Sequence, residues 1–218
     1  MTEDQKRAEI CAVGLKLYRQ GFVAANDGNI SCRLSSDSFL ITPTNVSKGD
    51  LEPEDLIVIS DGGFRGKTKP SSEYKMHLEI FQKRSDVNAI IHVHSPYATA
   101  FALVGKGMDE PILPEVVVTL GKIPLVPYET PSTRKFAETV AETAIHYDAM
   151  LLEKHGVVTL GENIRDAYYK LERTEHVFKI VQIARHIGDI KPLSRAEVEE
   201  LINAYSIPDR IKKELINL

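Results

Sequence analysis

The chain has 218 residues, of which 43% are hydrophobic and 27% are charged, so it can bury one sizeable core. Its formal net charge of −4 and the lack of a basic cluster argue against a nucleic-acid-binding protein. No apolar run approaches the roughly 18 residues that a membrane span needs, and the amino terminus lacks the apolar core of a signal peptide. We therefore predict one cytoplasmic domain over residues 1–218, with no nucleic acid or membrane as a partner.

Hydrophobic periodicity and turn residues predict an alternation of helices with short strands. Helices are expected over residues 8–19, 70–84, 96–103, 132–145, 163–186, 194–204 and 208–215. Strands are expected over residues 29–34, 39–42, 56–60 and 89–93, and on both sides of His155. The first three strands follow one another without a helix, which favours antiparallel pairing. The whole pattern indicates a layered α/β or α+β domain.

The short apolar run from Ile90 to Pro96 contains a His-x-His pattern, formed by His92 and His94. Side chains two apart on a strand point to the same face, so both imidazoles would reach one space. Neutral imidazoles are common ligands of zinc and similar divalent ions. The alternative is that one is a core histidine with a hydrogen-bond partner and the other lies at a strand end.

His155 is the strongest candidate for a third ligand. Two apolar runs meet at Lys154-His155-Gly156, which predicts two strands joined by a tight turn at the edge of a sheet. Three protein ligands with an open fourth position are typical of catalytic zinc sites, whereas structural sites usually have four ligands rich in cysteine. The chain has only two cysteines, Cys11 and Cys32, which we interpret as small buried hydrophobes.

The other four histidines fall in predicted helices rich in charge, where a solvated or hydrogen-bonded structural role is typical. They are His77, His146, His176 and His186. His77 lies one helical turn after Glu73, so this pair could bind a metal through facing side chains. We rank it below the strand pair because no second helix supplies a matching motif.

Three polar loops combine small hydroxyl or amide side chains with bends that expose backbone N–H groups. They span residues 25–31, 41–45 and 70–72. The serines of the third loop precede a predicted helix, whose positive end attracts anions. Each loop alone is most simply a turn or a helix cap, but the three together suggest a phosphate site.

Five motifs, in this order, resemble the class II aldolase and adducin family, in particular its L-fuculose-1-phosphate aldolases. They are Gly28-Asn29-Ile30-Ser31, Ile41-Thr42-Pro43-Thr44, Pro70-Ser71-Ser72-Glu73, His92-Val93-His94-Ser95 and Lys154-His155-Gly156. The resemblance implies a three-layer α/β/α sandwich around a mainly antiparallel sheet. It also implies a homotetramer with active sites at the subunit interfaces.

The same resemblance implies roles for individual residues. His92, His94 and His155 would hold Zn²⁺, or another divalent transition metal. Glu73 would sit beside the metal and serve as the acid and base at carbon. The residues implied to bind the phosphate of a sugar phosphate are Asn29, Thr44, Asn45, Ser71 and Ser72, of which Asn45 stands where the fuculose enzymes have glycine.

Glu115 is the largest departure from the fuculose enzymes, which have a tyrosine at this place. That tyrosine reaches a neighbouring subunit's site and assists protonation at the aldehyde end of the substrate. The methylthioribulose-1-phosphate dehydratases of the family instead use a glutamate in this stretch as a base and lack the acid that corresponds to Glu73. We favour the aldolases because Glu73 lies in an intact motif, and we assign Glu115 a second catalytic role.

These observations predict a zinc-dependent aldolase that cleaves a ketose 1-phosphate to dihydroxyacetone phosphate and a short aldehyde. The candidate substrates are L-fuculose 1-phosphate and a 5-deoxypentulose 1-phosphate. The alternative enzymes are a methylthioribulose-1-phosphate dehydratase, a ribulose-5-phosphate 4-epimerase and a sugar-acid phosphate decarboxylase. The epimerase ranks lower because it has an aspartate at the position of Glu73. An adducin-like binding module without a metal is the non-enzymatic alternative.

Overall fold

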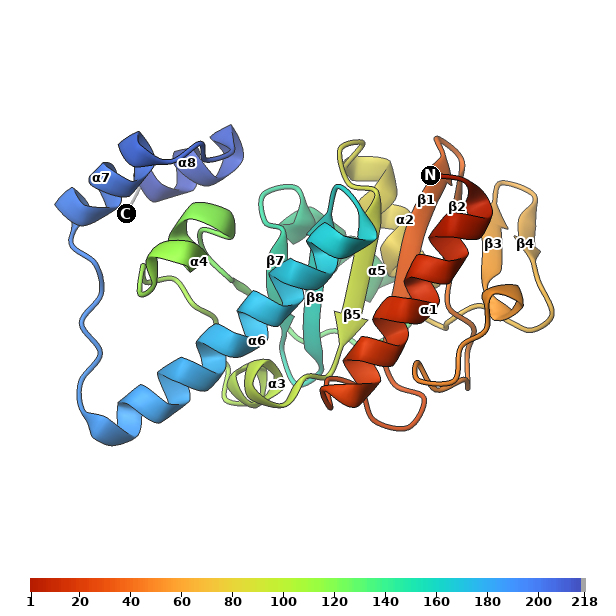
Figure 1. Cartoon of the computed structure of the whole chain (residues 1–218), viewed down its shortest axis with the longest axis horizontal. Helices are drawn as coiled ribbons and strands as arrows, with labels where there is room; N and C mark the ends of the chain where they lie inside the picture. Colours follow the sequence, from red (N-terminus) through yellow and green to blue (C-terminus); the bar gives the residue numbers. More distant parts are fainter. Residues whose placement is uncertain (217–218) are drawn as a thin grey trace.

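One eight-stranded sheet runs through the protein, with the strand order β4-β3-β2-β1-β5-β8-β7-β6 (Figure 1). The structure is a computed structural model and describes residues 1–216. The strands are β1 Asn29–Ser35, β2 Ser38–Ile41, β3 Ile57–Ser60, β4 Gly63–Arg65, β5 Ala89–Val93, β6 Leu125–Val126, β7 Ala149–Leu152 and β8 Gly156–Gly161. All neighbouring pairs are antiparallel except β6 and β7. The sheet is therefore mixed but mainly antiparallel, as predicted.

Helices cover both faces of this sheet. They are α1 Glu3–Arg19, α2 Tyr74–Lys83, α3 Pro96–Leu103, α4 Pro114–Thr119, α5 Arg134–Ala144, α6 Ile164–Ile187, α7 Arg195–Ala204 and α8 Asp209–Ile216, with a short 3₁₀ helix at Pro53–Asp55. In Figure 1, α1 and α6 lie in front of the sheet and α2 and α5 lie behind it. The three-layer α/β/α sandwich is thus confirmed.

The central strand β5 shows how the sequence builds these layers. Its side chains alternate between the two faces, as the period of a strand requires. Ala89, Ile91 and Val93 pack into the core on the side of α1, α3 and α6. Ile90 packs on the opposite side, with residues of α2 and α5. His92 has the parity of Ile90, so its imidazole lies on the side of α2.

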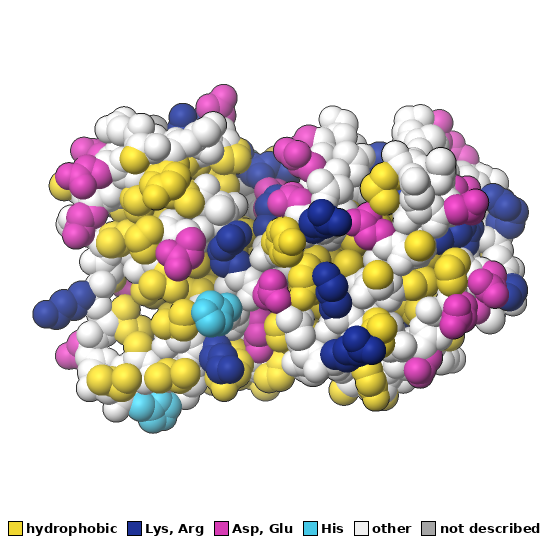
Figure 2. All heavy atoms as spheres, in the orientation of Figure 1, with side chains coloured by type: hydrophobic (Ala, Val, Ile, Leu, Met, Phe, Trp, Pro, Cys, Tyr) yellow, Lys and Arg dark blue, Asp and Glu magenta, His cyan; other side chains and the backbone are white. Residues whose placement is uncertain are grey.

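A smaller hydrophobic cluster joins the carboxyl-terminal helices to α4. Val117 of α4 packs with Val198 of α7 and with Ile211 and Leu215 of α8. An extended segment after α6 leads to these helices, which sit over α4 (Figure 1). Figure 2 shows Lys and Arg side chains interspersed with Asp and Glu side chains on the face drawn.

Several elements differ from the sequence prediction, among them α1, which begins at Glu3 and not at residue 8, and α4 and β6, which were not predicted. The helix expected from Pro70 begins at Tyr74, and Glu73 occupies its cap position with φ −95° and ψ 11°. The short strand β4 was not expected, since its three residues are all exposed and show no apolar alternation. Within the described residues, no helix has the length and the apolar character needed to cross a membrane. The single domain over residues 1–218 stays a prediction, and residues 217–218 lie outside the described part.

Candidate active site

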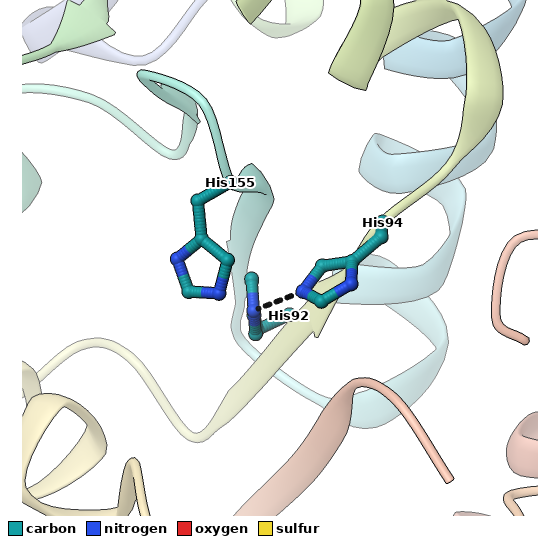
Figure 3. Close-up of side chains that lie close together, drawn as sticks. All are labelled: His92, His94 and His155. Atoms are coloured by element: carbon teal, nitrogen blue, oxygen red, sulfur yellow. Dashed lines mark hydrogen bonds between the residues drawn. The ribbon is translucent and has the colours of Figure 1, made fainter. Parts of the chain in front are cut away.

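Three histidines from two neighbouring strands meet at one end of the sheet (Figure 3). His92 lies in β5, His94 follows the end of β5, and His155 lies in the turn between β7 and β8. Strands β5 and β8 pair directly, with Val93 opposite Val157, so the turn comes beside the His-x-His segment. One ring nitrogen from each histidine lies within 4.8 Å of the others. The structure therefore brings together the three residues predicted to bind a metal.

Two glycines allow the backbone to pack this closely around the histidines. A Cβ atom at Gly156 would lie 2.4 Å from the carbonyl oxygen of Val93 and 2.8 Å from the His94 ring. Gly28 has a φ of +75°, and a Cβ atom there would lie 2.8 Å from the carbonyl oxygen of His92. A side chain at either position would push the strands or the rings apart.

The hydrogen bonds and the burial of the imidazoles suit metal binding. His92 Nδ1 lies 3.0 Å from the carbonyl oxygen of Val157 and donates to it, which leaves Nε2 as the free lone pair. His92 Nε2 and His94 Nε2 are 3.3 Å apart (Figure 3). Burial lowers the pKa of His92 well below its usual value and lowers the pKa of His155 to about 3. Both rings are therefore neutral, which is the form that coordinates metal ions.

Glu73 faces two of these imidazoles. Its carboxylate oxygens lie 3.3 Å from His92 Nε2 and 3.4 Å from His155 Nε2. The side chain is buried, and Oε2 accepts a hydrogen bond of 2.8 Å from Asn29 Nδ2. The other oxygen, Oε1, has no hydrogen-bond partner in the described part of the chain. A buried carboxylate beside two imidazoles, with one oxygen that makes no hydrogen bond, is placed to exchange a proton with a molecule bound there.

The predicted phosphate loops lie against one another beside Glu73. An isolated bridge joins Pro43 to Pro70, and Ser71 N donates to the carbonyl oxygen of Thr42. Ser71 is buried and Ser72 is exposed, in the turn that precedes α2. Asn29 begins β1, which pairs with β2 just before the loop that holds Thr44 and Asn45. Their binding of phosphate stays a prediction.

Asn45 adopts a backbone conformation that is common for glycine. Its φ is +59°, in the left-handed region that glycine adopts freely and that asparagine tolerates better than most residues. The loop therefore makes a left-handed bend at Asn45 without a glycine.

Glu115 lies on a part of the surface away from the three histidines. It is exposed in the first turn of α4 and lines a cavity of about 630 Å³ with Pro96, Tyr97 and His176 among others. None of the three metal-site histidines lines that cavity. The structure does not bring Glu115 to the metal site within one chain, and its catalytic role stays a prediction.

Two buried residues shape the site, of which Lys48 was not predicted and His77 was ranked below the strand pair. Lys48 is 1% exposed, and its Nζ donates to the carbonyl oxygens of Asn26 and Val46, which ties two of the polar loops together. Burial lowers the pKa of its amine to about 8. The other residue is His77, which is 0% exposed and contacts Asn29 rather than solvent. Its spacing from Glu73 was the one signal in the sequence, whereas nothing marked Lys48.

Comparison with known sequences places the chain among sugar-phosphate enzymes. The class II aldolase and adducin N-terminal domain matches residues 8–182. The chain is 35% identical to the 3-oxo-tetronate 4-phosphate decarboxylase of Pectobacterium atrosepticum, over 92% of the chain and 94% of that protein. The Haemophilus influenzae decarboxylase is 34% identical over 93% of the chain and 99% of its own length. The L-fuculose phosphate aldolase of Methanococcus vannielii is 40% identical, but over 77% of the chain.

Solved structures agree with this placement. YgbL from Klebsiella pneumoniae superposes with a TM-score of 0.85 at 32% identity, over 92% of the chain and 99% of its own. An L-fuculose 1-phosphate aldolase gives a TM-score of 0.83 at 27% identity, over 92% of the chain and 95% of its own. The predicted ketose 1-phosphate aldolase is corrected by these findings, because the relatives whose sequences match over nearly the whole chain at 34% and 35% identity are decarboxylases, whereas the aldolase structure is 27% identical. The chain belongs to the class II aldolase and adducin family.

Proposed function

We propose that the protein is a metal-dependent decarboxylase of a 3-oxo sugar-acid phosphate, with 3-oxo-tetronate 4-phosphate as the favoured substrate. The observation that carries this proposal is the full-length match to the decarboxylases, at 35% identity over 92% of the chain. The match to the fuculose aldolase is shorter and covers 77% of the chain. A cytoplasmic location and a homotetramer with shared active sites remain part of the proposal.

The donor set fits a divalent transition metal. His92 presents a free Nε2 because its Nδ1 is bound to the backbone, and His155 is held neutral by burial. With His94 these residues would hold Zn²⁺ or a similar ion and leave a position open for substrate. When bound, such an ion would supply Lewis acidity to the ketone oxygen of the substrate.

The chemistry of the substrate explains what the chain's own residues must do. In 3-oxo-tetronate 4-phosphate the carboxylate is C1, the hydroxyl is on C2, the ketone is C3 and the phosphate is on C4. Breaking the C1–C2 bond releases CO₂ and leaves the electron pair on C2, shared with the ketone oxygen. A proton must then reach C2, and the product is dihydroxyacetone phosphate. Glu73 is the buried acid beside the imidazoles that would deliver this proton.

Decarboxylation also accounts for the departure at Glu115. An aldolase must move a proton at the aldehyde end of its substrate, which the fuculose enzymes assist with a tyrosine. CO₂ leaves without exchanging a proton, so a decarboxylase needs no such group. A glutamate in place of the tyrosine in the first turn of α4 is compatible with this reaction.

Reaction in deuterated water tests the proposal. We expect the metal-loaded protein to convert 3-oxo-tetronate 4-phosphate to CO₂ and dihydroxyacetone phosphate in equal amounts, with one deuterium on the carbon that carried the carboxylate. The unphosphorylated 3-oxo acid is the matched control and should react much more slowly. Release of no CO₂, or turnover of both acids at the same rate, would show that the proposed function is wrong.

A further inference from the structure

Three buried polar side chains form a line behind the carboxylate of Glu73. Asn29 Nδ2 donates to Glu73 Oε2 over 2.8 Å, and Asn29 Oδ1 lies 2.5 Å from His77 Nε2. On the far side of the ring, His77 Nδ1 lies 2.6 Å from Ser31 Oγ. Asn29 is 3% exposed, and Ser31 and His77 are 0% exposed. The line begins at Ser31 in β1, crosses to His77 in α2, returns to Asn29 in β1 and ends at Glu73 in the candidate active site.

The hydrogen bonds of this line assign the protons along it. Asn29 Nδ2 donates to Glu73 Oε2, so the Asn29 amide presents its N–H group to the carboxyl group. The amide oxygen then faces His77, whose Nε2 must carry the proton. His77 Nδ1 is left as an acceptor and takes the hydroxyl proton of Ser31.

Burial keeps His77 in this form. It lowers the pKa of His77 to about 3, so the ring is neutral at physiological pH. A neutral imidazole has one donor and one acceptor, and both are used here. An apolar residue would leave the Asn29 amide oxygen and the Ser31 hydroxyl buried without these partners, which is costly. The Asn29 amide could then rotate and turn its oxygen towards Glu73.

We infer that His77 is a positioning residue that, together with Ser31, fixes the amide of Asn29 and thereby holds the Glu73 carboxylate against His92 and His155. The inference rests on the proposed role of Glu73 as the acid that acts on substrate. In the described part of the chain His77 is hydrogen-bonded to Asn29 and Ser31 and to no metal-site histidine, so it acts through Asn29. The role explains why a fully buried helix position holds an imidazole in place of an apolar side chain.

Two substitutions of His77 by side chains of similar size distinguish a positioning role of this residue from a packing role. The amide nitrogen of His77→Gln can reach the place of Nε2 and donate to Asn29, whereas His77→Leu fills the space without a donor. We expect His77→Leu to lose about 10–100-fold in kcat, as outer-shell partners typically do, with KM and metal content unchanged. His77→Gln should stay within about fivefold of the wild type. Equal losses in the two variants, or full activity of His77→Leu, would overturn the inference.

Nitrogen NMR of the wild-type protein tests the same inference without substrate. In protein labelled with ¹⁵N at histidine, His77 should show a protonated Nε2 and an unprotonated Nδ1 throughout the neutral pH range. A proton on Nδ1, or a charged ring at pH 7, would refute the line of hydrogen bonds. This measurement needs no turnover, so it is decisive if His77→Leu does not fold, and its result is independent of the decarboxylase proposal.

Discussion

At the scale of single residues, His155 is the candidate metal ligand that comes from a turn, whereas His92 and His94 come from one strand and its end. Its ring is neutral and partly buried, and it contacts the apolar core at the ring of Phe136. We expect His155→Ala to reduce bound metal from about one ion per chain to a small fraction, with the fold retained. Elemental analysis after dialysis, with circular dichroism, measures both.

The control for this substitution is His186→Ala. His186 is an exposed histidine near the end of α6, and its ring bonds the carbonyl oxygen of Gln182 in the same helix. This variant should keep the full metal content. Full metal content in the His155→Ala protein would remove His155 from the site.

His77 also makes the stability of the metal-free protein depend on pH. Its pKa is lowered to about 3 by burial in the folded state, whereas the unfolded chain takes up the proton near pH 6.5. Its contribution to the free energy of unfolding is therefore present above pH 6.5 and is lost as the pH falls, by about 1.4 kcal/mol per pH unit. We expect urea unfolding of His77→Gln to show a shallower pH dependence between about pH 6 and 4 than the wild type. Parallel curves for the two proteins would contradict this.

At the scale of elements, Glu175 of α6 connects the long helix to the segment that carries His94. It is 5% exposed and accepts hydrogen bonds from Ser95 Oγ and from the backbone N–H groups of Tyr97 and Ala98. These N–H groups belong to the first turn of α3, which has no partner for them within the helix.

We expect Glu175→Gln to lower the free energy of unfolding by about 2–3 kcal/mol, because one acceptor oxygen and the charge are lost while the groups stay buried. Urea denaturation measures the change, and it should be accompanied by weaker metal binding through His94. Glu162→Gln, an exposed glutamate beside the same helix, is the control and should change stability by less than about 0.5 kcal/mol. Equal effects of the two substitutions would show that the contact to α3 contributes nothing.

The elements that hold the metal ligands could be predicted, because short-range signals define them. The alternation around His92 and the glycine turn after His155 each depend on neighbouring residues alone. The start of α2 could not be placed, since serines favour a turn and a helix cap equally. The roles of His77 and Lys48 depend on partners 48 and 22 residues away, at Asn29 and Asn26, which no local pattern indicates.

At the scale of the whole molecule, the sequence indicated the family and the sandwich but gave the wrong reaction. The physical reason lies in the shared intermediate. Aldol cleavage of a ketose 1-phosphate and decarboxylation of a 3-oxo sugar-acid phosphate both leave a negative charge beside a ketone, and both then place a proton on that carbon. The roles proposed for Glu73 and the three histidines fit either reaction, so these residues do not identify the fragment that leaves. The match to a decarboxylase over 92% of the chain favours the second reaction.

Glu115 and Glu73 should therefore differ in importance. Glu73→Gln should lose about 10²–10⁴-fold in kcat with its metal retained, as expected for a general acid. Glu115→Gln should lose less than about tenfold, because no proton moves at the departing end. Initial rates of CO₂ release measure both variants. A larger loss in Glu115→Gln, together with release of water from methylthioribulose 1-phosphate, would favour a dehydratase.

A direct comparison of two substrates tests best whether this chain is a decarboxylase. The measurement is kcat/KM of the same metal-loaded preparation for 3-oxo-tetronate 4-phosphate and for L-fuculose 1-phosphate, with dihydroxyacetone phosphate detected in both cases. We expect the 3-oxo acid to be preferred by about 100-fold or more. A preference for L-fuculose 1-phosphate, with lactaldehyde formed in place of CO₂, would contradict the account.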